Sequence, residues 1–277
     1  MSKNIVHDTV KALAESDATG EIAKIFSEIR STMQIPMLTS IWRILADSLV
    51  DLDLTWKAVK PLYKTGQPES ALARLRSEAL FPKLRPISLK EIEEVGVSPD
   101  ELKNIKAILS AYNRSNSLNL LTQSALVPDQ IKKYIAYPPE KTNFIPSNLP
   151  RLLPREEISD SVWKVILKIN KYGTTGVNPG LATIFRHLAY WPNLLSLMQV
   201  RLENTQETGE ISIGANSVSE IAIEEGNRMT KLRDQAALDK MSSYAHDTIK
   251  QYVNGPFGCS RIVNIGTALS LWLERAK

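Results

Sequence analysis

The feature that most constrains this chain is a stretch that occurs twice, at 36–46 and again at 179–189. The first copy reads PMLTSIWRILA and the second PGLATIFRHLA, so Pro, Leu, a hydroxyl residue, Ile, an aromatic residue, Arg, Leu and Ala recur at one spacing. The copies lie 143 residues apart (179 − 36), which is close to half of the 277-residue chain. Self-similarity at a fixed offset indicates a duplicated unit. We therefore expect two related halves, with any central site between them.

A second signal falls just after the midpoint, where prolines are dense. They are Pro138, Pro139, Pro146, Pro150 and Pro154. Proline lacks an N–H and restricts the residue before it, so neither a helix nor a central strand tolerates this density. The stretch predicts an extended linker. We expect an N-terminal helical repeat at 1–137, a Pro-rich linker at 138–155 and a C-terminal helical repeat at 156–277.

Both copies of the repeat have a helical pattern of apolar residues. In the first copy, apolar side chains recur at i, i+3, i+4, i+7 and i+8 from Leu38, and the second copy reproduces this from Leu181. Such a stripe is typical of an amphipathic helix. The same reading along the chain predicts an all-α fold of two pseudo-symmetric helical repeats, with helices near 20–32, 37–50, 52–64, 69–80, 98–113, 117–126, 159–171, 180–190, 193–205, 217–232, 236–252 and 260–274.

Capping signals support the helical prediction. Serines at 88, 98 and 217 are each followed three residues later by a glutamate, the spacing of a capping box. The only short alternation is Ile211-Ser212-Ile213 between Gly209 and Gly214, which is too brief to form a sheet.

Composition narrows the classes of protein. The chain is 43% hydrophobic and 23% charged, and its net charge is only +4 with basic and acidic residues interleaved, which argues against a nucleic-acid partner. No window approaches the roughly 18 apolar residues that a membrane span needs, and the N-terminus has no apolar signal region. The only cysteine, Cys259, cannot form an internal disulfide, and we expect it to be a small core residue in a cytoplasmic protein.

Familiar catalytic motifs are absent from the sequence. There is no Walker loop and no dinucleotide fingerprint, and the three histidines, His7, His187 and His246, lie far from one another without an HExxH motif. We therefore expect neither a metal nor a cofactor.

Two polar features have both a functional and a structural interpretation. Ser40 and Arg43 share a helix face, as do Thr183 and Arg186, and could present quasi-symmetric polar groups to a central pocket. The simpler interpretation is that Arg43 pairs with Asp47 on a solvated face and that Arg186 is a surface residue. The run 111–119, AYNRSNSLN, either ends a helix or supplies neutral hydrogen-bond donors for a small carboxylate between two buried helices.

These residues resemble the group I 2-haloacid dehalogenases, which act on both D and L substrates. The resemblance covers most of the chain and rests on the order of several short motifs: TGE at 19–21, EIR at 28–30, IP at 35–36, RILA at 43–46, AYN with a further Asn at 111–116, and LAYWP at 188–192. It implies an all-helical protein of two pseudo-repeats joined by a linker, which usually forms a homodimer.

The resemblance also implies a reaction, the hydrolysis of the C2–halogen bond of a short 2-haloacid. In that family, an aspartate of the second repeat acts as general base on a water that attacks C2 directly. Counting back from Trp191-Pro192 through Phe185 places the position of this base at Ile184, and isoleucine has no atom that can accept a proton. By the same resemblance, the substrate-binding positions are Met37, Ser40, Asn116, Thr183 and Ile184.

Three hypotheses for the function follow. The chain is a dehalogenase-like hydrolase whose base comes from another residue, a diverged relative that binds a small carboxylate without dehalogenating it, or a structural helical protein. A polar cavity between Ser40, Asn116 and Thr183 is the structural observation that best separates them.

Overall fold

The computed structural model describes residues 12–127, 137–140, 144–174, 181–254 and 258–277. In these ranges the chain is helical and contains no strand, so the all-α prediction is confirmed. Within the same ranges, no helix combines the length and the apolar character needed to cross a membrane.

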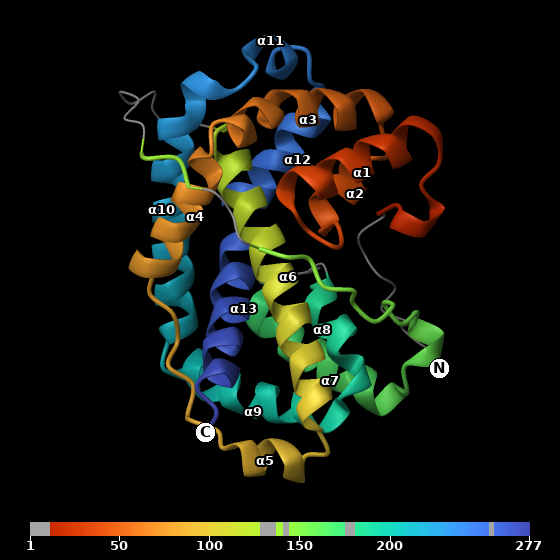
Figure 1. The fold of residues 1–277 in the computed structure, drawn as a ribbon, viewed down its shortest axis with the longest axis vertical. Coiled ribbons are helices and arrows are strands. Elements are labelled where there is room, and N and C mark those ends of the chain that lie inside the picture. The colour runs from red at the N-terminus through yellow and green to blue at the C-terminus, as the bar shows by residue number, and fades with distance from the viewer. Residues whose placement is uncertain (1–11, 128–136, 141–143, 175–180, 255–257) are drawn as a thin grey trace.

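Figure 1 shows the arrangement of the helices, most of which lie close to their predicted positions. In chain order they are α1 (Gly20–Met33), α2 (Ser40–Leu45), α3 (Leu49–Lys64), α4 (Gln67–Glu78), α5 (Leu89–Glu94), α6 (Pro99–Ser124), α7 (Asp160–Gly173), α8 (Thr183–His187), α9 (Pro192–Glu207), α10 (Glu210–Met229), α11 (Gln235–Leu238), α12 (Ser243–Asn254) and α13 (Cys259–Glu274). Short 3₁₀ turns occupy Glu15–Asp17, Arg155–Glu157, Leu188–Tyr190 and Thr230–Leu232.

The long helices α6, α10 and α13 pack together and connect two hydrophobic clusters at opposite ends of the molecule (Figure 1). The first cluster, at the top of the view, is formed mainly by α1 to α4, α11 and α12. The second, at the bottom, is formed mainly by α5 and α7 to α9. Each cluster takes residues from both sides of the linker, so the two halves predicted at 1–137 and 156–277 share their cores.

Helix α6 runs unbroken through both clusters, and the helix end predicted within 111–119 is wrong. Two of its buried asparagines bond to other elements and do not compete for their own backbone. The Asn113 side-chain amide donates to the carbonyl of Gly266 at 2.9 Å. The Asn119 side chain accepts the indole N–H of Trp42 at 2.8 Å. Since these partners are distant in sequence, local propensity could not predict the continuous helix.

Helix α10 begins earlier than predicted. It starts at Glu210, so Ile211-Ser212-Ile213 forms its first turn and Ser217 lies inside the helix, where its hydroxyl accepts the N–H of Leu80 at 3.1 Å. Gly214 is required by close packing, because a Cβ there would lie 2.3 Å from the side chain of Asn264. The capping box predicted at 217 is therefore wrong, whereas those at 88 and 98 are confirmed.

The helices of the repeated stretch are shorter than predicted, but they begin at matching positions. Helix α2 starts at Ser40 and α8 at Thr183, 143 residues apart (183 − 40) like the repeat itself. Helix α2 ends at Leu45 because a new N-cap follows, in which Ser48 Oγ accepts the N–H of Asp51 at 3.2 Å and starts α3. Residues 175–180, the start of the second predicted helix, lie outside the described ranges.

The predicted ion pair between Arg43 and Asp47 is wrong. Arg43 is half-buried and its Nε donates to the carbonyl of Leu13 at 2.9 Å, while Asp47 is exposed. Arg186 is also half-buried, so the two equivalent arginines of the repeat do not lie on a fully solvated face.

Candidate ligand-binding site

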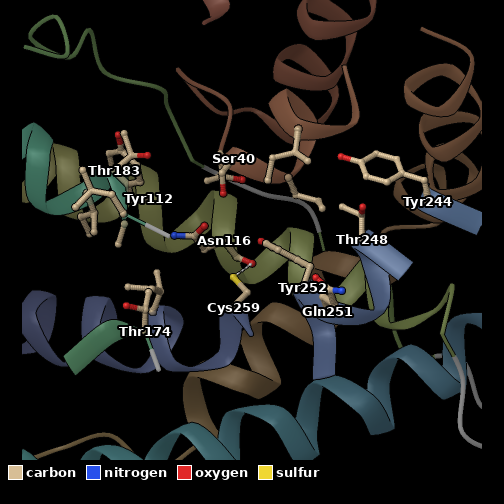
Figure 2. Close-up of a pocket in the computed structure, with 17 residues that line it drawn as sticks. Ser40, Tyr112, Asn116, Thr174, Thr183, Tyr244, Thr248, Gln251, Tyr252 and Cys259 are labelled. Carbon is tan, nitrogen blue, oxygen red and sulfur yellow. Dashed lines mark hydrogen bonds between the residues drawn. The ribbon is translucent and has the colours of Figure 1, made fainter. Parts of the chain in front are cut away.

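A cavity of about 430 Å³ lies between the two copies of the repeat. Its walls come from α2 and α8, from the polar middle of α6, from the start of α13 and from α12 (Figure 2). The position follows from the fold, because the polar segment of α6 falls between the residues that it contributes to the first and second hydrophobic clusters. A cavity at a junction between packed units is a common place for a small-molecule site.

Four of the five residues predicted to bind substrate line this cavity. They are Ser40, Asn116, Thr183 and Ile184. Asn116 differs from the other asparagines of α6, since its side chain makes no hydrogen bond with any described residue and remains available to a ligand. Met37 does not line the cavity; it is half-buried and packs against the second hydrophobic cluster.

Helix α12 supplies a wall that the sequence analysis did not predict. Tyr244, Thr248, Gln251 and Tyr252 project from it toward the cavity (Figure 2). Their spacing of i, i+4, i+7 and i+8 places them on one helix face. That spacing is the only signal in the sequence, and a polar helix stripe normally indicates a solvated surface.

No described residue that lines the cavity carries an acidic, basic or imidazole side chain. Asp47 is exposed, and the carboxylate of Asp51 accepts the N–H of Ser242 at 3.0 Å and its hydroxyl at 2.7 Å, away from the cavity. The segments 175–180 and 255–257, next to the cavity in sequence, contain no ionisable residue. Nor do the described residues bring three His, Cys, Asp or Glu side chains together as a metal site. The polar groups that the described residues supply to the cavity are therefore neutral hydroxyls and amides and the Cys259 thiol.

Tyr112 lines the end of the cavity near α8 and is held by a buried histidine. His187 Nε2 lies 2.6 Å from the carbonyl oxygen of Pro150, which can only accept, so Nε2 carries the proton. Its Nδ1 is then free to accept the Tyr112 hydroxyl at 3.2 Å. Burial lowers the pKa of His187 and Arg186 lowers it further, against the opposing effect of the Pro150 carbonyl, so the imidazole is neutral near pH 7.

Burial also raises the pKa of Tyr112, while Arg43 and Arg186 oppose this rise and Glu15 adds to it. The hydroxyl therefore stays protonated near pH 7 and cannot act as a general base. The two arginines are equivalent in the repeat, and both lie close enough to this end of the cavity for their charges to act on Tyr112, together with the opposing charge of Glu15.

Cys259 and Tyr252 meet on the opposite side. Cys259 is 5% exposed, its thiol lies 3.6 Å from the carbonyl oxygen of Asn116, and burial raises its pKa to about 12, so it is an inert core residue, as predicted. Burial likewise raises the pKa of Tyr252 well above its usual value. The Tyr252 hydroxyl is buried beside the Cys259 thiol and Thr39, which both affect its pKa.

Comparisons with known proteins agree with the resemblance found in the sequence. No family model matches the chain. A curated relative, the 2-haloacid dehalogenase, configuration-inverting, of Alcaligenes xylosoxydans xylosoxydans, is 26% identical over 195 residues, which span 67% of this chain and 66% of the relative. The chain thus spans just under two thirds of that relative's length.

Solved structures show the same fold. A D-2-haloacid dehalogenase mutant in complex with D-2-CPA and D-2-haloacid dehalogenase with L-LA each superpose with a TM-score of 0.77 at 16% identity. The matches cover 95% of this chain and 96% of each of theirs. The chain is therefore similar in sequence to a 2-haloacid dehalogenase and has the fold of the solved D-2-haloacid dehalogenases.

The position that the resemblance assigns to the general base is the most informative part of the site. It falls on Ile184, which is 2% exposed and belongs to the second hydrophobic cluster while also lining the cavity. Ile41, its equivalent in the first copy, is 1% exposed and lines the cavity as well. The cavity of this dehalogenase relative is thus apolar on both symmetric walls, with neutral polar groups between them.

Proposed function

We propose that this chain binds a short 2-haloacid or a related 2-substituted carboxylic acid in the cavity between α2 and α8. The observation that carries the proposal is the meeting of Ser40, Asn116 and Thr183 around one cavity in a relative of the 2-haloacid dehalogenases. These side chains supply hydroxyl and amide donors that suit carboxylate oxygens. The Asn116 amide is the strongest of them, because no described residue occupies it.

We place the ligand carboxylate at the end of the cavity next to Tyr112. Burying a carboxylate without compensating interactions is costly. Arg43 and Arg186 provide a favourable potential at this end, and a hydrogen bond to a charged group contributes about 1.5–3 kcal/mol. The 2-substituent then points toward the apolar Ile41 and Ile184.

The geometry favours binding without hydrolysis by the family's route. General base catalysis needs a proton acceptor within hydrogen-bond reach of the attacking water, and the described walls contain none that titrates near pH 7. Hydrolysis of the carbon–halogen bond with a base from another residue is the second candidate. It is favoured by the sequence relation to a protein named as a configuration-inverting 2-haloacid dehalogenase.

Calorimetry and halide release together test both candidates. Each enantiomer of 2-chloropropionate is titrated into the protein, and chloride is measured over the same period. We expect saturable binding that weakens at least tenfold in Asn116→Leu, and no chloride above the buffer rate. Lys250→Leu, on the exposed side of α12, is the control and should bind as wild type. Absence of binding by both enantiomers refutes the proposal. Chloride release above the buffer rate that is lost when one acid is mutated establishes the second candidate.

We also propose that the chain is a cytoplasmic homodimer built from two helical repeats at 1–137 and 156–277 around the linker at 138–155. The matching starts of α2 and α8 support the duplication, and the extended backbone of 144–154 supports the linker. Light scattering after size exclusion should give twice the monomer mass of 30.9 kDa. A mass of 30.9 kDa at all concentrations would refute the dimer.

A further inference from the structure

We infer that the ligand of this cavity is a larger acid than a three-carbon haloacid, with an extended and mainly apolar body that reaches α12 and ends in an uncharged group. This inference rests on the proposed function, because the carboxylate of the same ligand is placed beside Tyr112. It adds the part of the ligand that the α12 wall recognises.

The first argument is size. The cavity measures about 430 Å³. A three-carbon 2-haloacid has six non-hydrogen atoms and takes up at most about 180 Å³, if each atom is given the roughly 30 Å³ share of a liquid water. More than half of the cavity would remain empty, enough for roughly eight further atoms at the same share. Cavities of this size usually hold larger ligands, which they bury on most sides.

The second argument is the chemistry of the α12 wall. The side chain of Ile44 and the rings of Tyr244 and Tyr252 give this region apolar surface. A hydrocarbon or aromatic body can be buried here without leaving a polar group unpaired.

The third argument is the Tyr252 hydroxyl. It is buried, points into the cavity and lies beside Thr39 and Cys259 (Figure 2). A ligand that carries a polar group at this end can hydrogen-bond to this hydroxyl. Thr248 and Gln251 lie on the same helix face and offer further neutral donors and acceptors.

The fourth argument concerns charge. The described residues of the α12 wall that line the cavity are all uncharged, and the ionisable residues His246, Asp247 and Lys250 of this helix do not line it. A second carboxylate at this end would gain no counter-charge from the cavity wall. The far end of the ligand is therefore neutral, such as a hydroxyl, an amide or an unsubstituted chain end.

Binding constants for a series of acids test this inference independently of hydrolysis. The probes are 2-methyl acids of three, six, eight and ten chain carbons, the eight-carbon dicarboxylic acid with the same 2-methyl group, and 2-methyloctanamide. Each buried methylene should strengthen binding by up to about fourfold. We expect the eight-carbon acid to bind at least tenfold more tightly than the three-carbon acid, at one molecule per chain. The dicarboxylic acid should bind more weakly than the eight-carbon monoacid.

Two matched variants locate the effect on α12. Thr248→Phe fills the cavity beside this helix and should remove the gain in affinity with chain length. Lys250→Phe adds the same ring on the exposed side and should keep that gain. Tyr252→Phe should weaken binding of an acid with a terminal hydroxyl, relative to the unsubstituted acid of equal length.

The outcomes separate this inference from the proposed function. Equal affinities for all chain lengths, or a gain that survives in Thr248→Phe, overturn the inference while short-acid binding still supports the proposed function. If the amide binds as tightly as the acid, the carboxylate placement of the proposed function fails and the inference on size remains. If no acid binds, both fail.

Discussion

Replacing Ile184 with aspartate restores the acid that the resemblance expects, at a position that the structure shows to be buried. The side chain is 2% exposed and packs in the second hydrophobic cluster. Loss of the buried isoleucine surface costs about 2 kcal/mol. If burial raises the pKa of the new carboxyl by about 2 units, keeping it ionised at pH 7 costs about 2.7 kcal/mol more. The variant should therefore lose about 4–5 kcal/mol of unfolding free energy at pH 7.

The control is Ile184→Asn, which has nearly the same shape as the aspartate variant but no charge. It should lose the apolar contribution and carry the cost of a buried amide, but not the cost of ionisation. Because the raised pKa of the new carboxyl lies above its unfolded value, the ionisation cost is present at pH 7 and disappears as the pH falls to about 4. Urea denaturation of both variants at pH 7 and pH 4 measures this difference.

One result would refute the reasoning. Equal stability of the aspartate and asparagine variants at pH 7 would show that water already fills the cavity beside Ile184. A halide-release assay on the aspartate variant tests the function of the site. If it stays folded and releases chloride from 2-chloropropionate, the cavity retains the rest of the dehalogenase site and the purely structural hypothesis fails.

Three further changes test the packing around the cavity. Folding lowers the pKa of His187, so the unfolded chain takes up a proton at a higher pH than the folded protein and wild type should lose stability between pH 7 and pH 5. His187→Asn should lose less stability over the same range. Urea denaturation at both pH values measures this, and equal losses would contradict it. Asn119→Leu leaves the buried Trp42 indole N–H unpaired and should cost about 1–3 kcal/mol, whereas an unchanged melting temperature would show that this bond is dispensable. Gly226→Ala places a Cβ 2.4 Å from the Cβ of Ser124 and should lower the free energy of unfolding by about 1–3 kcal/mol, because it forces α6 and α10 apart. Unchanged stability in calorimetry would contradict this close contact.

The parts of the fold that the sequence could predict are those decided by local patterns. The apolar stripe that begins at Leu38 and the capping boxes at 88 and 98 require only neighbouring residues, and the structure has helices there. The middle of α6 could not be predicted this way. From local propensity alone, Asn119 favours a helix end. In the fold, its side chain accepts a hydrogen bond from the indole N–H of Trp42, which is far away in the sequence.

The candidate site could also be predicted only in part from the sequence. Ser40 and Thr183 could be paired from the sequence because the duplication relates them directly, and the cavity lies between them. The wall formed by α12 could not, because Thr248 and Gln251 have no counterparts in the repeated stretch. Polar side chains on one helix face look the same in a sequence whether they meet water or a cavity.

The symmetry of the repeat also bears on catalysis by the family's route. A duplicated helix pair begins with the same residue types on both walls of the cavity, and hydrolysis requires one wall to differ by carrying a base. In this chain Ile41 and Ile184 remain alike, and both are buried at the cavity. The wall that α12 adds lies outside the repeated stretch and is likewise uncharged. The described walls of the cavity therefore supply contacts for a bound molecule but no carboxylate or imidazole to accept a proton from water.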